Sequence, residues 1–216
     1  MALLLDRRGD DVQITEQVVK AAITNRMGKE IVALLLDRRG DEIQITEGMV
    51  KAAASAHFTS GVMTLLIDRR GDDIQITEEL TARIAERSSV EAMAMLLDRR
   101  GDDVQITEKV VKAAARNRIG EKVMALLLDQ RGDDVQITEE VMKAAAGNPN
   151  EAVMALLLDR RRDDVQITEE VMKAAEGGWN DGKVKRLLLD RRGGDVQITE
   201  DVIKAAAAAG QKQVLV

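Results

Sequence analysis

Residues 3–16 read Leu-Leu-Leu-Asp-Arg-Arg-Gly-Asp-Asp-Val-Gln-Ile-Thr-Glu, and this stretch recurs with small changes along the whole chain. Each of the seven copies has one aspartate directly after its apolar run, at Asp6, Asp37, Asp68, Asp98, Asp129, Asp159 and Asp190. Successive copies are 30 or 31 residues apart. A fixed period of this size is typical of solenoids, in which each repeat buries its apolar face only against its neighbours. The sequence therefore predicts a single repeat-array domain over residues 1–216, with a half-repeat at each end.

The end of this stretch predicts the start of a helix. Thr15 is placed to accept a hydrogen bond from a free amide of the first turn, and Ile14 and Val19 occupy the positions of a hydrophobic staple. Glu16 and Lys20 have the spacing and order of a favourable ion pair on one helix face. The same start recurs at Thr46, Thr77, Thr107, Thr138, Thr168 and Thr199. We call this the first helix of each repeat.

A second helix is expected over residues 29–39. Residues 31–36 are apolar at every position, which is typical of a helix that is buried nearly all round. Arg38 and Arg39 suit the negative end of the helix dipole, and Gly40 is placed for a left-handed cap. The stretch between the first and the second helix is called the interhelix loop below.

Residues 41–44 are expected to form a short extended link to the next repeat, with Ile43 and Ile45 on one side and Gln44 on the other. Packed helices lie about 8 to 10 Å apart, roughly twice the spacing of paired strands, so these links should not form a sheet. The sequence therefore predicts an all-α fold, an α-solenoid of about seven helix-turn-helix repeats.

The second helix and link resemble those of an ankyrin repeat. Residues 30–36, Glu-Ile-Val-Ala-Leu-Leu-Leu, are followed by a glycine and Asp-Glu-Ile-Gln, and the pattern Thr-x-x-apolar-apolar-x-Ala-Ala resembles the first ankyrin helix. The Thr-Pro-Leu-His motif is absent and no residues remain for β-hairpins, so an ankyrin-like array without β-hairpins is expected. The near-identical copies are also similar to the C-terminal repeats of fungal NOD-like-receptor-type (NACHT) proteins. That similarity implies a sensor or interaction array.

Composition excludes several classes of function. The net charge of −6 and the isoelectric point near 5.1 arise from interspersed charges, so we expect neither a nucleic-acid nor a membrane partner. There is no cysteine, which excludes disulfides and thiolate metal sites. The apolar runs are too short to span a bilayer, and Asp6 interrupts the first of them too early for a secretory signal. A cytoplasmic protein is expected.

Catalytic and metal-binding motifs are also lacking. The chain has one histidine, His57, in a predicted loop with no nucleophile placed beside it, and the glycines form no phosphate-binding loop. Arg-Gly-Asp occurs five times, beginning at Arg8, Arg39, Arg70, Arg100 and Arg131. We interpret these tripeptides as structural, and we expect the neighbouring aspartates to form an Asp/Arg ladder between repeats rather than a calcium site. The sequence thus predicts no enzyme, no metal and no cofactor.

The copies differ most in the interhelix loop, which contains the only His, Phe, Pro and Trp of the chain. Stacking in register would place these loops along one rim, where exposed aromatic, apolar and arginine side chains suit a protein contact. The candidate partner-binding residues are Arg26, Met27, His57, Phe58, Arg87, Arg118, Ile119, Pro149, Asn150, Trp179 and Asn180. The alternative is that these loops simply drift, since loops vary in any family.

The sequence therefore favours a non-enzymatic scaffold or sensor that binds a protein of unknown identity through its interhelix loops. Two alternatives remain open. The half-repeats leave Leu3–Leu5 at one end and Val202 and Ile203 at the other without a polar cap, which favours head-to-tail self-assembly. The close identity of the repeats also fits an engineered consensus-type scaffold without a natural ligand.

Overall fold

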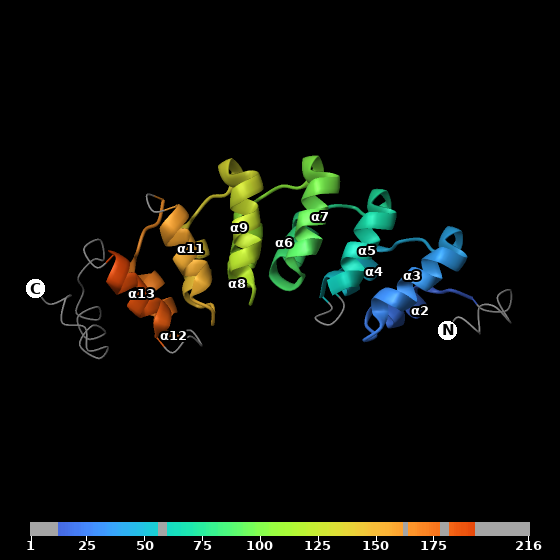
Figure 1. Ribbon diagram of the computed structural model, residues 1–216, viewed down its shortest axis with the longest axis horizontal. Helices are drawn as coiled ribbons and strands as arrows, with labels where there is room; N and C mark the ends of the chain where they lie inside the picture. The colour runs from blue at the N-terminus through green and yellow to red at the C-terminus, as the bar shows by residue number, and fades with distance from the viewer. Residues whose placement is uncertain (1–12, 56–59, 162–163, 178–181, 193–216) are drawn as a thin grey trace, which may run out of the picture. The chain divides into compact units, whose positions relative to one another are not determined.

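The structure is a computed structural model that describes residues 13–55, 60–161, 164–177 and 182–192 (Figure 1). In these four segments every regular element is an α-helix or a short 3₁₀-helix, and no strand occurs in them. This confirms the all-α fold, and the helix pairs repeat with the period of the sequence, as in an α-solenoid. No helix in the same segments is long and apolar enough to cross a membrane.

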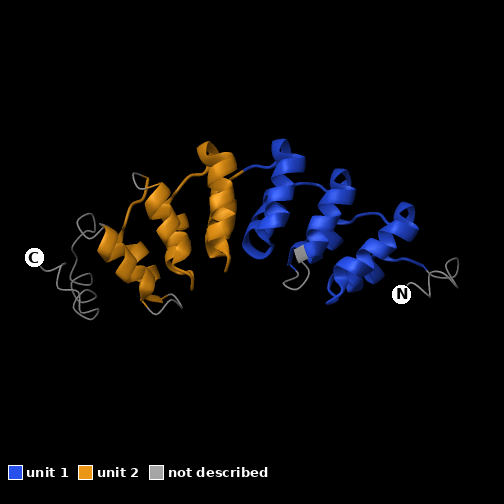
Figure 2. Cartoon of the chain, viewed as in Figure 1, with its two compact units in different colours: residues 1–105 blue, residues 106–216 orange. Residues whose placement is uncertain are grey.

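The chain divides into two compact units, Met1–Gln105 and Ile106–Val216, which are coloured separately in Figure 2. In the first unit the first helices are α2 (Glu16–Ile23), α4 (Glu47–Ser55) and α6 (Glu78–Arg87), and the second helices are α3 (Gly28–Arg39), α5 (Ser60–Arg70) and α7 (Val90–Arg100). Short 3₁₀ turns follow the second helices: η2 (Gly40–Glu42), η3 (Gly71–Asp73) and η4 (Gly101–Asp103). First helices contact first helices and second helices contact second helices, so the unit has two layers.

The second unit is built in the same way. Its first helices are α8 (Glu108–Arg116), α10 (Glu139–Ala146) and α12 (Glu169–Gly177), and its second helices are α9 (Gly120–Arg131), α11 (Ala152–Arg160) and α13 (Lys183–Arg192). The 3₁₀ turn η5 (Gly132–Asp134) follows α9. Helix α10 packs between α8 and α12, and α11 contacts both α9 and α13.

The predicted hydrogen bond at the start of the first helices is confirmed at five threonines, whereas Thr107 precedes α8 without a side-chain cap bond and Thr199 lies outside the described residues. The hydroxyl of Thr15 accepts a hydrogen bond from the Val18 amide at 3.4 Å, which satisfies one of the free donors of the first turn. The same bond forms at Thr46, Thr77, Thr138 and Thr168. The ion pair between Glu16 and Lys20 is also present, at 2.5 Å.

The core lies between the two layers. One leucine of each second helix is fully enclosed: Leu35, Leu66, Leu96, Leu127, Leu157 and Leu188. The prediction that the second helix is buried nearly all round is wrong in part, since Leu34 and Leu36 beside the enclosed Leu35 are only half-buried. The physical reason is the two-layer arrangement, which leaves each second helix one face that no third layer covers.

The left-handed cap predicted at Gly40 is also wrong. Gly40 has φ −57° and ψ −38°, which is a right-handed helical conformation. The α-helix ends because Arg39 departs from helical geometry, and Gly40 then starts a 3₁₀ turn that closes with the Ile43 amide donating to the Gly40 carbonyl at 3.1 Å. A Cβ added at Gly40 would meet nothing within 4 Å, and one copy of the repeat has Arg162 at the same position.

The predicted four-residue link is shorter than expected. Asp41 and Glu42 belong to the 3₁₀ turn, so the extended backbone begins only at Ile43. The predicted alternation holds from there, because Ile43 is buried and Gln44 is exposed, although Ile45 is only half-buried. Each repeat therefore has two connections with different backbones, the interhelix loop and this turn with its link.

Candidate functional site: the interhelix loops

Several of the predicted partner-binding residues are exposed on the interhelix loops. Met27 is 62% exposed and Ile119 is 44% exposed, and these are the large apolar side chains left exposed in the part of the chain that the structure describes. Arg26, Arg118 and Pro149 are exposed as well. Four further predicted residues lie outside the described segments and stay predictions: His57, Phe58, Trp179 and Asn180.

Two of the loops share one pattern, Asn-Arg-apolar-Gly, at residues 25–28 and 117–120. In both, the asparagine Oδ1 accepts a hydrogen bond from the amide two residues later, at 3.0 and 2.9 Å. In both, the glycine amide donates to the asparagine carbonyl at 2.9 Å. A Cβ added at Gly120 would lie 2.5 Å from the Ala114 carbonyl oxygen, so this loop requires glycine. These loops therefore have a defined backbone that turns the arginine and the apolar side chain outward.

A buried asparagine ties one loop to the loop of the preceding repeat. Asn148 is 2% exposed, and its Nδ2 donates to the carbonyls of Ala115 at 2.7 Å and Asn117 at 2.9 Å. Its Oδ1 accepts from the Asn150 amide at 2.8 Å. In the first unit Ser88 is similarly buried, and its hydroxyl donates to the Ala54 carbonyl at 3.3 Å.

The sequence pattern predicted a loop that is variable throughout and did not indicate this structural role. The available signal was the recurrence of asparagine at equivalent places, Asn25, Asn117 and Asn148. Asn150, one of the predicted binding residues, is half-buried and accepts a hydrogen bond from the Ala152 amide at 3.0 Å. It thus helps to start helix α11, whereas its neighbour Pro149 forms the exposed tip of that loop.

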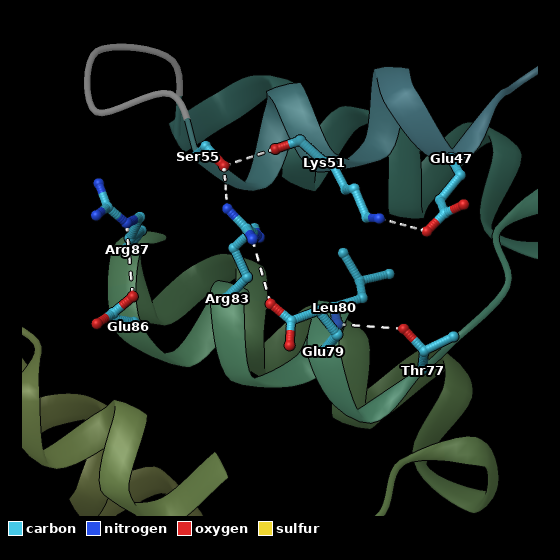
Figure 3. A network of polar contacts seen from close by, with 9 residues as sticks. All are labelled: Glu47, Lys51, Ser55, Thr77, Glu79, Leu80, Arg83, Glu86 and Arg87. Atoms are coloured by element: carbon cyan, nitrogen blue, oxygen red, sulfur yellow. Dashed lines mark hydrogen bonds and ion pairs between the residues drawn. The ribbon is translucent and has the colours of Figure 1, made fainter. Parts of the chain in front are cut away.

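Three cations in and beside the loop between α8 and α9 have no side-chain partner among the described residues. Arg116, Arg118 and Lys122 are exposed, and their side chains form no hydrogen bond or ion pair with any other described residue. They lie within a few positions of the exposed Ile119. By contrast, Arg87 of the third loop lies 3.5 Å from Glu86 (Figure 3).

The 3₁₀ turns at the other end of the helices differ sharply from these loops. Arg70 donates to the carbonyls of Gly40 at 3.0 Å and Ile43 at 3.1 Å in the preceding repeat, while its Nε donates to Asp73 at 2.5 Å. Arg161 repeats these contacts, donating to Gly132 at 3.0 Å, Val135 at 3.1 Å and Asp164 at 2.5 Å. The arginine that begins each Arg-Gly-Asp tripeptide thus has a structural role where these contacts are described.

The predicted Asp/Arg ladder between repeats is confirmed, with one correction. Arg99 pairs with Asp68 of the preceding repeat at 2.7 Å. The equivalent pairs are Arg69 with Asp37, Arg160 with Asp129, and Arg191 with Asp159. The ladder therefore uses the aspartate at the end of the second helix, whereas Asp103 of the Asp-Asp pair contacts Arg100 of its own repeat.

The exposed face of the first helices is largely neutralised by its own ion pairs. A hydrogen bond from Lys143 lowers the pKa of the Glu140 carboxyl from its ordinary value, and Lys112 lies 3.5 Å from the same carboxylate. Hydrogen bonds from Lys20 and then from Thr46 lower the pKa of Glu16 in the same way. This face therefore offers few free charges to a partner.

The third repeat of the first unit departs from this scheme. Arg83 replaces the alanine found at this position of other first helices, and it donates to Ser55 of the preceding repeat at 3.1 Å and to Glu79 at 3.2 Å (Figure 3). Its Nε is buried without a hydrogen-bond partner among the described residues. The guanidinium thus links α4 to α6, but its contacts are with the chain itself.

Metal and ligand sites are not evident beside the loops. Within the described segments, no group of three or more His, Asp or Glu side chains could hold a metal ion. A hollow of about 180 Å³ lies between α4 and α6, lined by Ile45, Glu47, Val50, Lys51, Asp73, Gln75, Thr77 and Leu80. It contains none of the predicted binding residues.

The family model described as "Domain of unknown function (DUF7104)" matches the chain in several successive segments. The matched residues are 3–31, 34–60, 65–80, 95–124, 126–154, 156–184 and 187–211. The third match stops inside α6, so the part of that repeat around Arg83 departs from the family pattern. Comparison with curated proteins and with solved structures found no match. The seven segments cover most of the 216 residues, and the chain therefore belongs to the DUF7104 family as a tandem array of seven repeats.

Proposed function

We propose that this protein is a non-enzymatic interaction scaffold that binds a protein partner through its interhelix loops. The observation that carries the proposal is the exposure of Met27 and Ile119, which both lie on these loops. Apolar anchors of this kind, next to arginine, are enriched in protein interfaces. The resemblance to the repeat arrays of fungal NACHT proteins supports the same role.

The ordered backbone of these loops favours a binding role over random variation of their sequence. The loops at residues 25–28 and 117–120 have the same internal hydrogen bonds, and Asn148 fixes a third loop to its neighbour. Binding of a partner to such loops costs little conformational entropy, because the helices already hold the loop backbone in place. Charged side chains that recur in the repeats, by contrast, already form ion pairs between and within repeats.

The proposal is tested by affinity capture with three forms of the full chain. The native chain is compared with the Met27→Ser/Ile119→Ser double variant and with a control, Gln44→Ser/Gln136→Ser, in which the exposed glutamines lie on the links. We expect a specific partner to bind the native chain and the control but not the loop variant. Equal capture by all three forms, or capture by none, would contradict the proposal.

A further inference from the structure

We propose that the Asn-Arg-apolar-Gly loops recognise an acidic protein segment in which carboxylates flank an apolar side chain. This inference rests on the proposed function and names the chemical class of the partner. It is argued from the loop between α8 and α9, and the loop between α2 and α3 supplies a second, independent copy of the same arrangement.

The charges around Ile119 select a carboxylate partner. Arg116, Arg118 and Lys122 are exposed and unpaired among the described residues, and Glu121 is the acidic side chain in the same stretch. The formal charge of residues 116–122 is therefore +2, from three cations and one anion. Exposed cations within a few residues of an exposed apolar side chain are complementary to an acidic segment with an apolar residue in its middle.

The loop between α2 and α3 repeats the arrangement with less charge. The side chains of Arg26 and Lys29 are exposed near Met27 and form no hydrogen bond or ion pair with other described residues, while Glu30 reduces the formal charge of the stretch to +1. Both loops thus place an unpaired arginine directly before an exposed apolar side chain. Recurrence of the arrangement in two copies indicates a common ligand chemistry.

These unpaired cations are unusual for this chain. Its net charge is −6, and arginines at the ends of the second helices, such as Arg70 and Arg99, bond carbonyls or aspartates of the preceding repeat. Exposed carboxylates without a described partner lie on the 3₁₀ turns, at Asp41, Asp72, Asp102 and Asp133, and also at Glu30 and Glu121. The stretches around Met27 and Ile119 nevertheless have a net positive formal charge, which steers an acidic partner toward the apolar anchor.

The third loop provides an internal control. Its Arg87 is exposed but lies beside Glu86, and the described residues of this loop include no large exposed apolar side chain. A charge reversal there alters the net charge of the chain by the same amount as a reversal at Arg118. It leaves the Asn-Arg-apolar-Gly loops untouched.

The test is a nuclear magnetic resonance titration of the isotope-labelled full chain, followed at the Met27 and Ile119 amides. The probes are three capped peptides: Glu-Asp-Leu-Asp-Glu, its amide counterpart Gln-Asn-Leu-Asn-Gln, and Glu-Asp-Ser-Asp-Glu. We expect the first peptide to shift both amides and to bind about tenfold or more tightly than either of the others. Binding should weaken as salt is raised, since the charges are exposed.

Matched variants complete the experiment. Arg118→Glu should abolish the shift at Ile119 while that at Met27 persists, and Arg87→Glu should leave both unchanged. Equal shifts with the acidic and amide peptides, or none with either, would overturn the inference. If affinity capture still depends on Met27 and Ile119 but the captured segment is neutral or basic, this inference fails and the proposed function stands. Capture that is insensitive to the loop variant defeats the proposed function instead.

Discussion

The two connections of a repeat, the 3₁₀ turn and the interhelix loop, differ in how they contact the preceding repeat. The 3₁₀ turns after α3, α5, α7 and α9 are nearly the same, and the arginine reaches the preceding repeat with two charge-assisted hydrogen bonds where these are described, as Arg70 does to Gly40 and Ile43. The interhelix loop varies, and there a single side chain, such as Asn148, reaches back to the preceding repeat. The remaining loop side chains, including Arg118 and Ile119, point outward.

This difference gives a physical reason for uniform and variable positions in a repeat array. A residue that bonds the preceding repeat must find the same acceptor at every step, so it has to recur at the same place. A residue that forms hydrogen bonds only within its own loop does not have to recur in the next repeat. The outward loop residues are therefore where an array of near-identical repeats can acquire specificity.

The largest expected effect concerns the core on which both connections depend. Leu127→Ala removes a side chain that is 0% exposed, and we expect the free energy of unfolding to fall by about 2 to 5 kcal/mol through loss of buried contacts and creation of a cavity. Urea denaturation followed by circular dichroism measures the loss. A decrease below about 1 kcal/mol would mean that the layers are not closely packed at this point.

Asn148→Ala tests whether the loop connection is held mainly by one amide. The change leaves the carbonyls of Ala115 and Asn117 without this donor, and we expect a loss of roughly 1 to 3 kcal/mol in the free energy of unfolding. The control is Pro149→Ala at the exposed neighbouring position. If both variants cost the same in urea denaturation, the loop is not anchored by the asparagine.

Arg70→Lys tests the turn connection. Lysine keeps the charge but cannot span the Gly40 and Ile43 carbonyls and Asp73 together, so a loss of about 0.5 to 1.5 kcal/mol is expected. Arg26→Lys on a loop, where the arginine has no described partner, should cost nothing measurable. Equal denaturation midpoints for the two variants would remove the distinction between turn and loop.

Ile119→Ser should change the free energy of unfolding by no more than about 0.5 kcal/mol, because the side chain is 44% exposed. The same variant is expected to lose partner binding. Stability and recognition would thus separate at one residue. A large loss of stability in thermal denaturation would show instead that Ile119 belongs to the core.

The smallest effect is a pH dependence on the face of the first helices. The hydrogen bond from Lys143 lowers the pKa of Glu140 in the folded chain, so its stabilisation is present above the ordinary pKa of 4.5 and is lost as the pH falls through the folded value. We expect Glu140→Gln to reduce the difference between urea midpoints measured at neutral and at acid pH. An unchanged difference would mean that the ion pair contributes nothing in solution.

Local rules predicted much of the fold from sequence. The cap at Thr15 and the ion pair between Glu16 and Lys20 depend only on residues one helical turn apart, and both are present. The burial of Leu35 was expected from the continuous apolar run, although the run did not distinguish Leu35 from the half-buried Leu34 and Leu36. The prediction at Gly40 was wrong because a glycine after a helix fits two turn conformations, and the choice of a 3₁₀ turn is not visible in the pattern.

Contacts between repeats were harder to foresee. Asn148 bonds carbonyls more than thirty residues earlier, and its amide looked like an ordinary loop residue. The ladder was predicted, but the sequence did not show which aspartate of the preceding repeat pairs with Arg99. That choice depends on how the repeats stack, and the partner is Asp68. The roles of His57 and Trp179 lie outside the described residues and stay predictions.

The arginine of the turn also gives the stack a direction. Arg70 and Arg161 donate to the repeat before them, and so do Asn148 and the hydroxyls of Thr46 and Thr168. Each repeat is therefore completed by the one that follows it in the chain. Removing a later repeat takes these donors away from the backbone carbonyls of the earlier one, whereas removing an earlier repeat takes the acceptors away from side chains of the later one. During synthesis, each new repeat would then supply the side-chain donors that bond the turn of the repeat made just before it.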